Sequence, residues 1–199
     1  MIVLDHDQGT EAWFAARLGK PSASMFSKLL TTTGKPSSSA DGYINQLIAE
    51  ALTGQSEGHF SNAHTDRGNL LEPDARDMYE FISGNEVLEV GFILDDSLGF
   101  GCSPDGLVGS NGGLELKCPA GNTQVAYLRD PTVGVKKYWQ QLQGCMLVTG
   151  RDWWDFMTYH PDMPHVLVRI NRDEEYIAKL AEELSKAVNV IETELEKLR

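Results

Sequence analysis

The sequence has little cysteine and no long apolar run. Among its 199 residues there are three cysteines, Cys102, Cys118 and Cys145, and none of them form a C-x-x-C pair. An odd number without that spacing argues against a disulfide framework or a zinc site, and it indicates a reducing compartment. No apolar run approaches the roughly 18 residues that cross a membrane. Residues 1–20 also lack a basic segment followed by an apolar one, so we expect a soluble cytoplasmic protein.

Positive charge is also scarce. The chain holds 29 Asp and Glu against 17 Lys and Arg, which gives a net charge of −12. Taken over the whole chain, this balance argues against a polyanionic partner, because nucleic acids are bound through Lys and Arg. Net charge, however, describes solubility and association rather than one groove. Since acidic residues gather in places such as residues 173–199, a local basic groove remains compatible with the composition.

The spacing of apolar residues predicts a mixed fold. Helical spacing is found over residues 11–19, 21–32, 41–54, 70–84, 135–150 and from about 173 to the C-terminus. Strands are predicted over residues 86–94, 98–106, 112–119, 153–160 and 165–171. The length fits a single domain over residues 1–199. We therefore expect an α/β or α+β fold with a central mixed β-sheet flanked by helices.

The stretch CSPDGLVGSNGGLELKCP, residues 102–119, places charged residues on and beside a predicted strand. Side chains at positions i and i+2 of a strand share a face, so Glu115 and Lys117 point one way and Leu116 points the other. A glycine-rich turn precedes this strand. If the segment is a β-hairpin, Asp105 comes close to Glu115.

Two close carboxylates repel each other, and burial increases the repulsion. A divalent cation removes this penalty, and Mg²⁺ usually takes one or two carboxylates together with waters and phosphate oxygens. Beside such a cation, Lys117 could orient an attacking water or stabilise a transition state. An ordinary structural interpretation also exists. Pro-Asp-Gly is a common turn sequence, and Glu-x-Lys is common on a solvated strand face.

The surrounding motifs resemble a known family. PDG followed by a glycine-rich turn and GLELKCP resembles the PD-(D/E)XK nuclease signature, in the form carried by phage lambda exonuclease and the YqaJ-type viral recombinase family. The segments that resemble other motifs of this family are QGTEAWFAARLGKPSAS (8–24), RGNLLEPDAR (67–76), YWQQLQGCMLVTG (138–150) and WWDFMTYHPDM (153–163). The resemblance spans most of the chain and implies a restriction-endonuclease-like core.

The resemblance implies a metal site and a catalytic lysine. Asp105 and Glu115 match the metal-binding carboxylates, and Lys117 matches the catalytic lysine. The backbone carbonyl of Leu116 is expected to complete a metal shell, and Glu72 is expected to lie near a second ion. The implied metal is Mg²⁺, for which Mn²⁺ is expected to substitute.

The resemblance also implies residues around this centre. Arg17, Ser24 and Ser103 match residues that bind a 5′-phosphate. Gln141 and Gln143 match a Q-x-Q motif that supports the site. These two glutamines are separated by about 200° around a helix, so we expect one of them, Gln141, to reach the centre.

Each of these residues has an ordinary alternative. Arg17 could be a surface arginine at a helix end, and Ser24 and Ser103 could be capping or turn residues. Glu72 precedes Pro73, which is predicted to lie in the first turn of the helix over residues 70–84. An acidic residue at a helix start is favoured by the helix dipole alone.

The basic residues expected to offset the acidic balance lie on predicted loops or helix starts near these motifs. They are Lys20, Lys28, Lys35, Arg67, Arg76, Arg129, Lys136 and Lys137. We expect this set to contribute to a DNA-binding groove. The segment over residues 58–68, where the family places residues that separate the strands, offers only Phe60 as an apolar wedge.

The function that the resemblance implies is a metal-dependent 5′-to-3′ exonuclease. Such an enzyme degrades one strand of linear double-stranded DNA to mononucleotides and leaves a 3′ overhang for recombination by strand annealing. The expected partners are DNA ends, a single-strand annealing protein and two further copies in a homotrimer, within a bacterial or phage-infected bacterial cell. Two alternatives remain open: a PD-(D/E)XK endonuclease or repair nuclease, and a non-catalytic DNA-binding scaffold.

Overall fold

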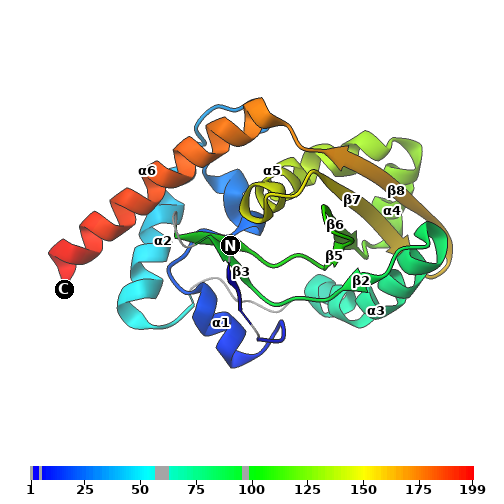
Figure 1. Ribbon diagram of the computed structural model, residues 1–199, viewed down its shortest axis with the longest axis horizontal. Coiled ribbons are helices and arrows are strands. Elements are labelled where there is room, and N and C mark those ends of the chain that lie inside the picture. Colours follow the sequence, from blue (N-terminus) through cyan, green and yellow to red (C-terminus); the bar gives the residue numbers. More distant parts are fainter. Residues whose placement is uncertain (1, 5, 57–62, 96–98) are drawn as a thin grey trace.

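The computed structural model describes residues 2–4, 6–56, 63–95 and 99–199 (Figure 1). The helices are α1 (Glu11–Arg17), the 3-10 helix η1 (Ala23–Lys28), α2 (Ala40–Thr53), α3 (Ala63–Ser83), α4 (Gly121–Arg129), α5 (Pro131–Thr149) and α6 (Glu174–Leu198). The strands are β1 (Ile2–Val3), β2 (Val87–Leu88), β3 (Ile93–Asp95), β4 (Phe100–Cys102), β5 (Gly106–Val108), β6 (Gly112–Lys117), β7 (Trp153–His160) and β8 (Met163–Asn171).

The predicted mixed sheet flanked by helices is confirmed. Five strands form one sheet in the order β2-β5-β6-β7-β8, in which β6 and β7 are parallel and the other neighbours are antiparallel. A smaller antiparallel sheet has the order β1-β3-β4. Helix α3 packs on one face of the larger sheet, and α4 and α5 pack on the other (Figure 1). The β6–α4–α5–β7 segment is the crossover that a parallel strand pair requires.

The strands predicted over residues 86–94 and 98–106 are each divided. Strand β2 pairs with β5 in the larger sheet, whereas β3 pairs with β4 in the smaller one. The chain changes sheets between Cys102 and Gly106, at the segment Ser103–Pro104–Asp105. Proline cannot donate to a strand ladder, which favours a break at this place. Ser103 and Asp105 therefore lie where the two sheets meet.

The helix predicted over residues 70–84 begins earlier, at Ala63, so Pro73 lies inside it rather than in its first turn. The prediction was wrong because residues 63–69 are mostly polar and show no apolar period. The helix predicted over residues 21–32 is the short 3-10 helix η1. Helix α4 was not predicted, since its sequence GNTQVAYLR begins with glycine and asparagine and has a weak apolar pattern.

The core has two parts, one on each face of the larger sheet. The larger part contains Trp154 of β7, Leu142 of α5 and Leu180 of α6, all without solvent exposure. The smaller part joins α3 to the other face through residues such as Tyr79 and Met157. Alternate residues of β7 thus serve opposite cores, as the two-residue period of a strand requires.

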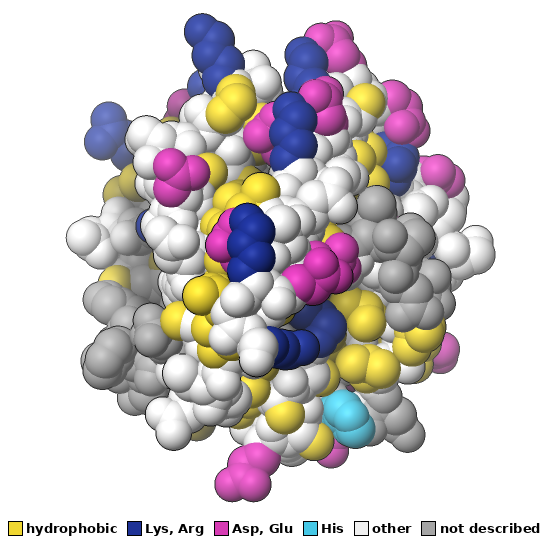
Figure 2. Space-filling view, turned by 90° about the vertical axis from the view of Figure 1, so that its left-hand side faces the viewer, with side chains coloured by type: hydrophobic (Ala, Val, Ile, Leu, Met, Phe, Trp, Pro, Cys, Tyr) yellow, Lys and Arg dark blue, Asp and Glu magenta, His cyan; other side chains and the backbone are white. Residues whose placement is uncertain are grey.

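Helix α6 covers the larger core with its apolar side and presents ion pairs on its outer side. These pairs join Lys179 to Glu175, Lys186 to Glu182 and Lys197 to Glu194. On the side of the molecule where α6 ends, basic and acidic side chains are intermixed (Figure 2). None of the helices in the described ranges is long and apolar enough to cross a membrane.

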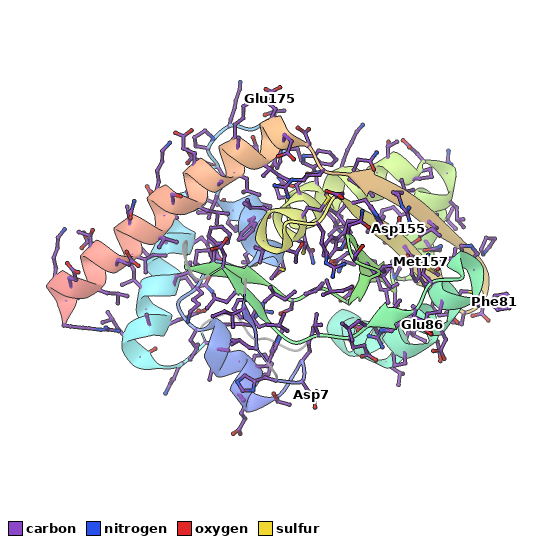
Figure 3. All side chains as sticks on the ribbon, in the orientation of Figure 1. Asp7, Phe81, Glu86, Asp155, Met157 and Glu175 are labelled. Carbon is purple, nitrogen blue, oxygen red and sulfur yellow. The ribbon has the colours of Figure 1, made fainter. Side chains whose placement is uncertain are left out.

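A buried aspartate ties the sheet to α3. The carboxylate of Asp155, on the same side of β7 as Met157 (Figure 3), accepts a hydrogen bond from the hydroxyl of Tyr79 at 2.8 Å. It also accepts two from Arg169 of β8, both at 2.8 Å. The guanidinium of Arg169 stacks on Trp153 at 3.6 Å from the ring centre. Because every partner is satisfied, this network stabilises the contact between α3, β7 and β8.

Replacing Asp155 with alanine is expected to lower the free energy of unfolding by about 3 kcal/mol, because the buried hydroxyl of Tyr79 loses its acceptor. Asp152 provides the control, since it is exposed and its carboxylate contacts Asn111. Asp152→Ala should cost less than about 1 kcal/mol. Urea unfolding of both variants measures the difference, and equal values would show that the network contributes nothing to stability.

Candidate active site

The predicted hairpin is present, and it places Asp105 against the next strand. Strands β5 and β6 pair antiparallel, with Gly106 opposite Leu114. Asp105 directly precedes β5, and its Oδ2 accepts the backbone N–H of Leu116 at 2.6 Å. A hydrogen bond of this kind ties the carboxylate to the middle of β6, beside Glu115.

The two glycines at the start of β6 have a packing role. A Cβ atom on Gly112 would lie 2.0 Å from the ring of Trp153, and one on Gly113 would lie 2.3 Å from the ring of Trp154. The rings of β7 thus lie directly against the backbone of β6. Only glycine permits this approach, which fixes β6 on the sheet immediately before Glu115.

Glu115 is fully buried and is held by two side chains. Its Oε1 accepts hydrogen bonds from Nζ of Lys117 and, at 2.7 Å, from Nε2 of Gln141 of α5. Its Oε2 is also buried and has no hydrogen-bond partner among the described residues. The interpretation of Glu115 as part of a solvated strand face is therefore wrong. A buried carboxylate oxygen without a partner is costly unless something else binds it.

The other face of β6 is apolar, as the strand period predicts. Leu114 and Leu116 pack with Tyr79 and Met157 in the smaller core. Gln143, the second glutamine of the Q-x-Q motif, points elsewhere, donating to the carbonyl of Asn171 and accepting the N–H of Asp173. The expectation that Gln141 and not Gln143 reaches the carboxylates is thus confirmed.

Glu72 reaches the same place from α3. It lies in the middle of the helix, so its interpretation as a helix-start acid is wrong. Its Oε1 accepts a hydrogen bond from Arg76 at 2.7 Å, and the other side of that guanidinium contacts Glu89 at 3.0 Å. Arg76 therefore interacts with two carboxylates at once, and Glu72 still lies close enough to Asp105 for that carboxyl group to raise its pKa.

Arg17, Ser24 and Ser103 meet around a second centre. The Oγ of Ser103 accepts hydrogen bonds from Arg17 at 2.9 Å and from Trp13 at 3.1 Å, so its own O–H remains available to donate. Ser22 contacts both Arg17, at 3.5 Å, and Ser24, at 3.4 Å. The guanidinium of Arg17 stacks on Trp13 at 4.1 Å from the ring centre, and burial lowers its pKa. Arg17 is thus not a free surface arginine.

One cleft of about 820 Å³ joins these groups. Its lining includes Arg17, Ser24, Glu72, Ser103, Asp105, Leu116, Lys117 and Gln141. The ninth predicted residue, Glu115, lies behind Lys117 and Gln141. The structure therefore brings all nine together. Trp13, Tyr127 and Tyr138 also line the cleft, and no role at the site was predicted for them. Trp13 and Tyr138 lie in the segments over residues 8–24 and 138–150 that resemble family motifs, whereas Tyr127 lies outside every such segment.

The eight basic residues expected in a groove are mostly elsewhere. Of these, Lys137 alone lines the cleft in the described part of the chain. Arg76 lines a second cleft of about 820 Å³ that shares Glu72 and Asp105 with the first. Phe60, the expected wedge, lies outside the described residues.

The carboxyl groups of the site hold protons unusually strongly. Burial and the nearby Asp105 raise the pKa of Glu115 to about 8, although Lys117 acts in the opposite direction. Burial and Asp105 also raise the pKa of Glu72 to about 7, which Arg76 partly offsets. Burial raises the pKa of Asp105 as well. Burial alone would lower the pKa of Lys117, but Glu115 and Asp105 raise it, so the lysine stays charged.

These observations fit a divalent cation. Three carboxyl groups that disfavour ionisation in one another's presence are stabilised by an added positive charge. The unpartnered Oε2 of Glu115 provides a ligand oxygen. Within the described ranges, no group of three His, Cys, Asp or Glu side chains is placed to hold a metal by itself. The donor set would thus be Asp105 and Glu115 with a backbone carbonyl and waters, a set that suits Mg²⁺.

The fold and the site together define the class of protein. The mixed sheet with flanking helices matches phage-type exonuclease structures. More particularly, the chain belongs to the YqaJ-like viral recombinase domain family, whose pattern matches residues 12–152. This confirms the family expected from the motifs.

Solved structures show the same similarity. The chain is 39% identical to an alkaline exonuclease (LHK-Exo) from Laribacter hongkongensis, covering 95% of this chain and 96% of that one with a TM-score of 0.85. LHK-Exo in complex with dAMP matches at 40% identity with a TM-score of 0.83, over 95% and 96% of the two chains. A phage-related exonuclease from Haemophilus somnus 129PT shares the fold at 18% identity, with a TM-score of 0.77 over 90% and 96% of the chains. Comparison with curated protein sequences gives no match.

Proposed function

We propose that this protein is a metal-dependent exonuclease that degrades the 5′-ended strand of linear double-stranded DNA. The observation that carries the proposal is the cleft that Asp105 and Lys117 line, with Glu115 directly behind Lys117 and its Oε2 without a hydrogen-bond partner among the described residues. Support comes from the 39% identity to an alkaline exonuclease. A relative at 40% identity binds dAMP, which is the kind of mononucleotide that an exonuclease releases.

Asp105, Glu115 and the backbone carbonyl of Leu116 would hold Mg²⁺ or Mn²⁺, with Glu72 serving a second ion. The bound ion would supply Lewis-acid activation of water and neutralisation of phosphate charge. Gln141 fixes the orientation of Glu115 through the 2.7 Å hydrogen bond. Lys117 keeps its charge, so its ammonium can orient the attacking water or stabilise the charge that develops on the phosphate.

The 5′-phosphate would bind at the Arg17 end of the cleft. A guanidinium and serine hydroxyls are good donors to phosphate oxygens. Arg17 is already oriented by Trp13 and Ser103, and Ser24 lies nearby on η1. This arrangement would favour a phosphorylated 5′ end, because the terminal phosphate would position the first phosphodiester bond near the carboxylates.

Arg17→Gln is expected to reduce kcat/KM on 5′-phosphorylated duplex by about 10- to 100-fold, since a hydrogen bond between two charged groups is lost. On duplex with a 5′-hydroxyl end the variant should match wild type within a few-fold. Arg129→Gln, at an exposed position on α4, is the control and should keep the preference for phosphate. An equal loss on both substrates would place the 5′-phosphate elsewhere.

The proposed function is tested with linear and covalently closed duplexes in Mg²⁺. The exonuclease should release mononucleotides from the 5′ strand of the linear duplex, leave a 3′ overhang, and not cut the closed circle. Cleavage of the circle would support the endonuclease or repair nuclease. Absence of any nucleotide release would support the non-catalytic scaffold.

Assembly and partners form part of the proposal. A homotrimeric ring would enclose the duplex and explain processive degradation, and a single-strand annealing protein would take up the 3′ overhang. The family name, a viral recombinase domain, supports this role in recombination. Sedimentation of the purified protein tests the trimer, and a mass of one or two chains would exclude it.

A further inference from the structure

One end of the cleft is formed by three side chains that the proposal above does not use. Tyr127 comes from α4, and Lys137 and Tyr138 come from α5. Lys137 and Tyr138 both act on the pKa of Tyr127, and both tyrosines raise the pKa of Lys137, so the three polar groups lie close together. The Nζ of Lys137 lies 5.2 Å from the centre of the Tyr138 ring, and the Nζ of Lys117 lies 5.1 Å from the same centre.

Lys137 has no acidic partner in the described part of the chain. Lys117, Lys179, Lys186 and Lys197 each contact a carboxylate within 4 Å, but Lys137 does not. Its contacts are with the two tyrosines, which raise its pKa and keep it charged at neutral and alkaline pH. In a chain with 29 acidic residues against 17 basic ones, this uncompensated cation faces the cleft.

The cluster of Tyr127, Lys137 and Tyr138 lies next to Lys117, beside which the reacting phosphate is proposed to bind. The two ammonium groups lie against one ring and are at most about 10 Å apart. This upper bound allows them to contact neighbouring phosphates of one DNA strand.

A series of contacts connects the two ends of the cleft: Arg17 donates to Ser103, Asp105 accepts the N–H of Leu116, and Lys117 lies against the ring of Tyr138. The carboxylate of Asp105 and the ammonium of Lys117 thus lie between Arg17 and the cluster that contains Lys137.

We propose that Lys137, with the hydroxyls of Tyr127 and Tyr138, binds the phosphate that follows the scissile one on its 3′ side. This inference rests on the proposed function, which places the 5′-phosphate at Arg17 and the scissile phosphate at the carboxylates. Lysine binds phosphate as a point charge, and tyrosine hydroxyls donate to phosphate oxygens. Contacts to phosphates on both sides of the scissile bond set the register of the strand, so that each cleavage removes one nucleotide.

The test removes the charge of one phosphate at a time. Four 5′-phosphorylated duplexes are compared, one unmodified and three with a single neutral methylphosphonate at the second, third or fourth linkage of the degraded strand. Single-turnover release of the first nucleotide is measured for wild type, Lys137→Met and Tyr127→Phe. Lys136→Met is the matched control, because Lys136 is exposed beside Lys137 on α5 and does not line the cleft.

Wild type and Lys136→Met should be slowed about tenfold or more by the change at the second linkage, because a charge-assisted contact is lost. Lys137→Met should release nucleotide slowly from the unmodified duplex, and a neutral second linkage should reduce its rate little further. Tyr127→Phe should show a smaller loss of the same kind. The inference would be overturned if a neutral second linkage slowed Lys137→Met as much as it slows wild type. It would also be overturned if the two proteins differed only at a neutral third or fourth linkage.

Binding measurements separate this inference from the proposed function. The affinities of the same duplexes are measured in EDTA, where cleavage is not required. One possible result is that wild type releases no nucleotide, while a neutral second linkage weakens DNA binding by wild type more than by Lys137→Met. The proposed function then fails, but the contact between Lys137 and that phosphate is supported. If wild type cleaves but a neutral second linkage changes the rate and affinity of wild type and Lys137→Met equally, the exonuclease is supported and the contact is rejected.

Discussion

Lys117→Ala is expected to reduce the rate of nucleotide release by about 10³-fold or more, with little change in affinity for duplex DNA. The ammonium lies beside Glu115 and stays charged, so its loss removes the group proposed to orient water or stabilise developing charge. The rate is measured under single turnover with 5′-phosphorylated linear duplex, and affinity is measured in EDTA.

A second measurement distinguishes the chemical role from an effect on Glu115. Without Lys117, Oε1 of Glu115 keeps the hydrogen bond from Gln141 and no other from the described residues, so the Mg²⁺ affinity of the variant must also be determined. Lys179→Ala, which breaks a surface ion pair on α6, is the control for loss of a lysine. If Lys117→Ala retains more than a tenth of the wild-type rate at saturating Mg²⁺, the assignment of Lys117 is wrong.

Removal of the metal is expected to leave a protein that becomes less stable as pH rises. The ordinary pKa of glutamate is 4.5, and that of Glu115 is raised to about 8 in the folded chain. The folded state therefore holds a proton that the unfolded chain releases. Its contribution to stability is complete below the unfolded pKa and is lost as pH rises through the folded pKa, here between roughly pH 5 and 8.

Glu115→Gln should abolish this loss together with the activity. In EDTA at pH 8 the variant is expected to be more stable than wild type by about 3 kcal/mol, because no charge is buried at this position. Nucleotide release should fall by about 10³-fold or more, since the proposed metal ligand is replaced. Glu175→Gln, on the outer side of α6 far from the cleft (Figure 3), should change neither property.

Mg²⁺ should restore the stability of wild type but not of Glu115→Gln. Since the carboxylates must lose protons to bind the ion, affinity should rise about tenfold per pH unit between roughly pH 6 and 8. Calorimetric titration and the rise of Tm with Mg²⁺ both measure this dependence. A wild-type affinity that does not change over this range would contradict a site built on Glu115 and Glu72.

The centre of the site is predictable from the sequence because it depends on local geometry. A strand places Glu115 and Lys117 on one face, and a hairpin returns Asp105 to that strand within a few residues. Helical geometry likewise separates Gln141 from Gln143, and the structure shows only Gln141 at the carboxylate. These relations require no knowledge of distant packing.

Other features depend on contacts between distant segments. The stretch over residues 98–106 reads as one strand, but β4 and β5 belong to different sheets. Helix α3 extends through a polar stretch that carries no apolar period, so its start was predicted too late. The burial of Glu115 also follows from α5 crossing the sheet rather than from its own neighbours, which is why spacing alone favoured a solvated strand face.

The end of the cleft near Lys137 shows the same limit. Tyr127 lies on a helix that the sequence pattern did not predict, and Lys137 is one of eight basic residues that looked alike in sequence. Only the packing of α4 against α5 places the tyrosine beside the lysine, which has no acidic partner among the residues that the structure describes. Its proposed contact with phosphate therefore arises from the structure.

The amino-acid order alone determined the motif residues, the fold class and the faces to which successive side chains of β6 point. This is because periods of two and 3.6 residues are properties of the local backbone. The tertiary structure decided which charges are buried, which are paired and which face the cleft. Those outcomes depend on desolvation and on neighbouring residues of α1, α3, α4 and α5. Desolvation and charge interactions depend on distances in three dimensions, which the order of residues along the chain does not give.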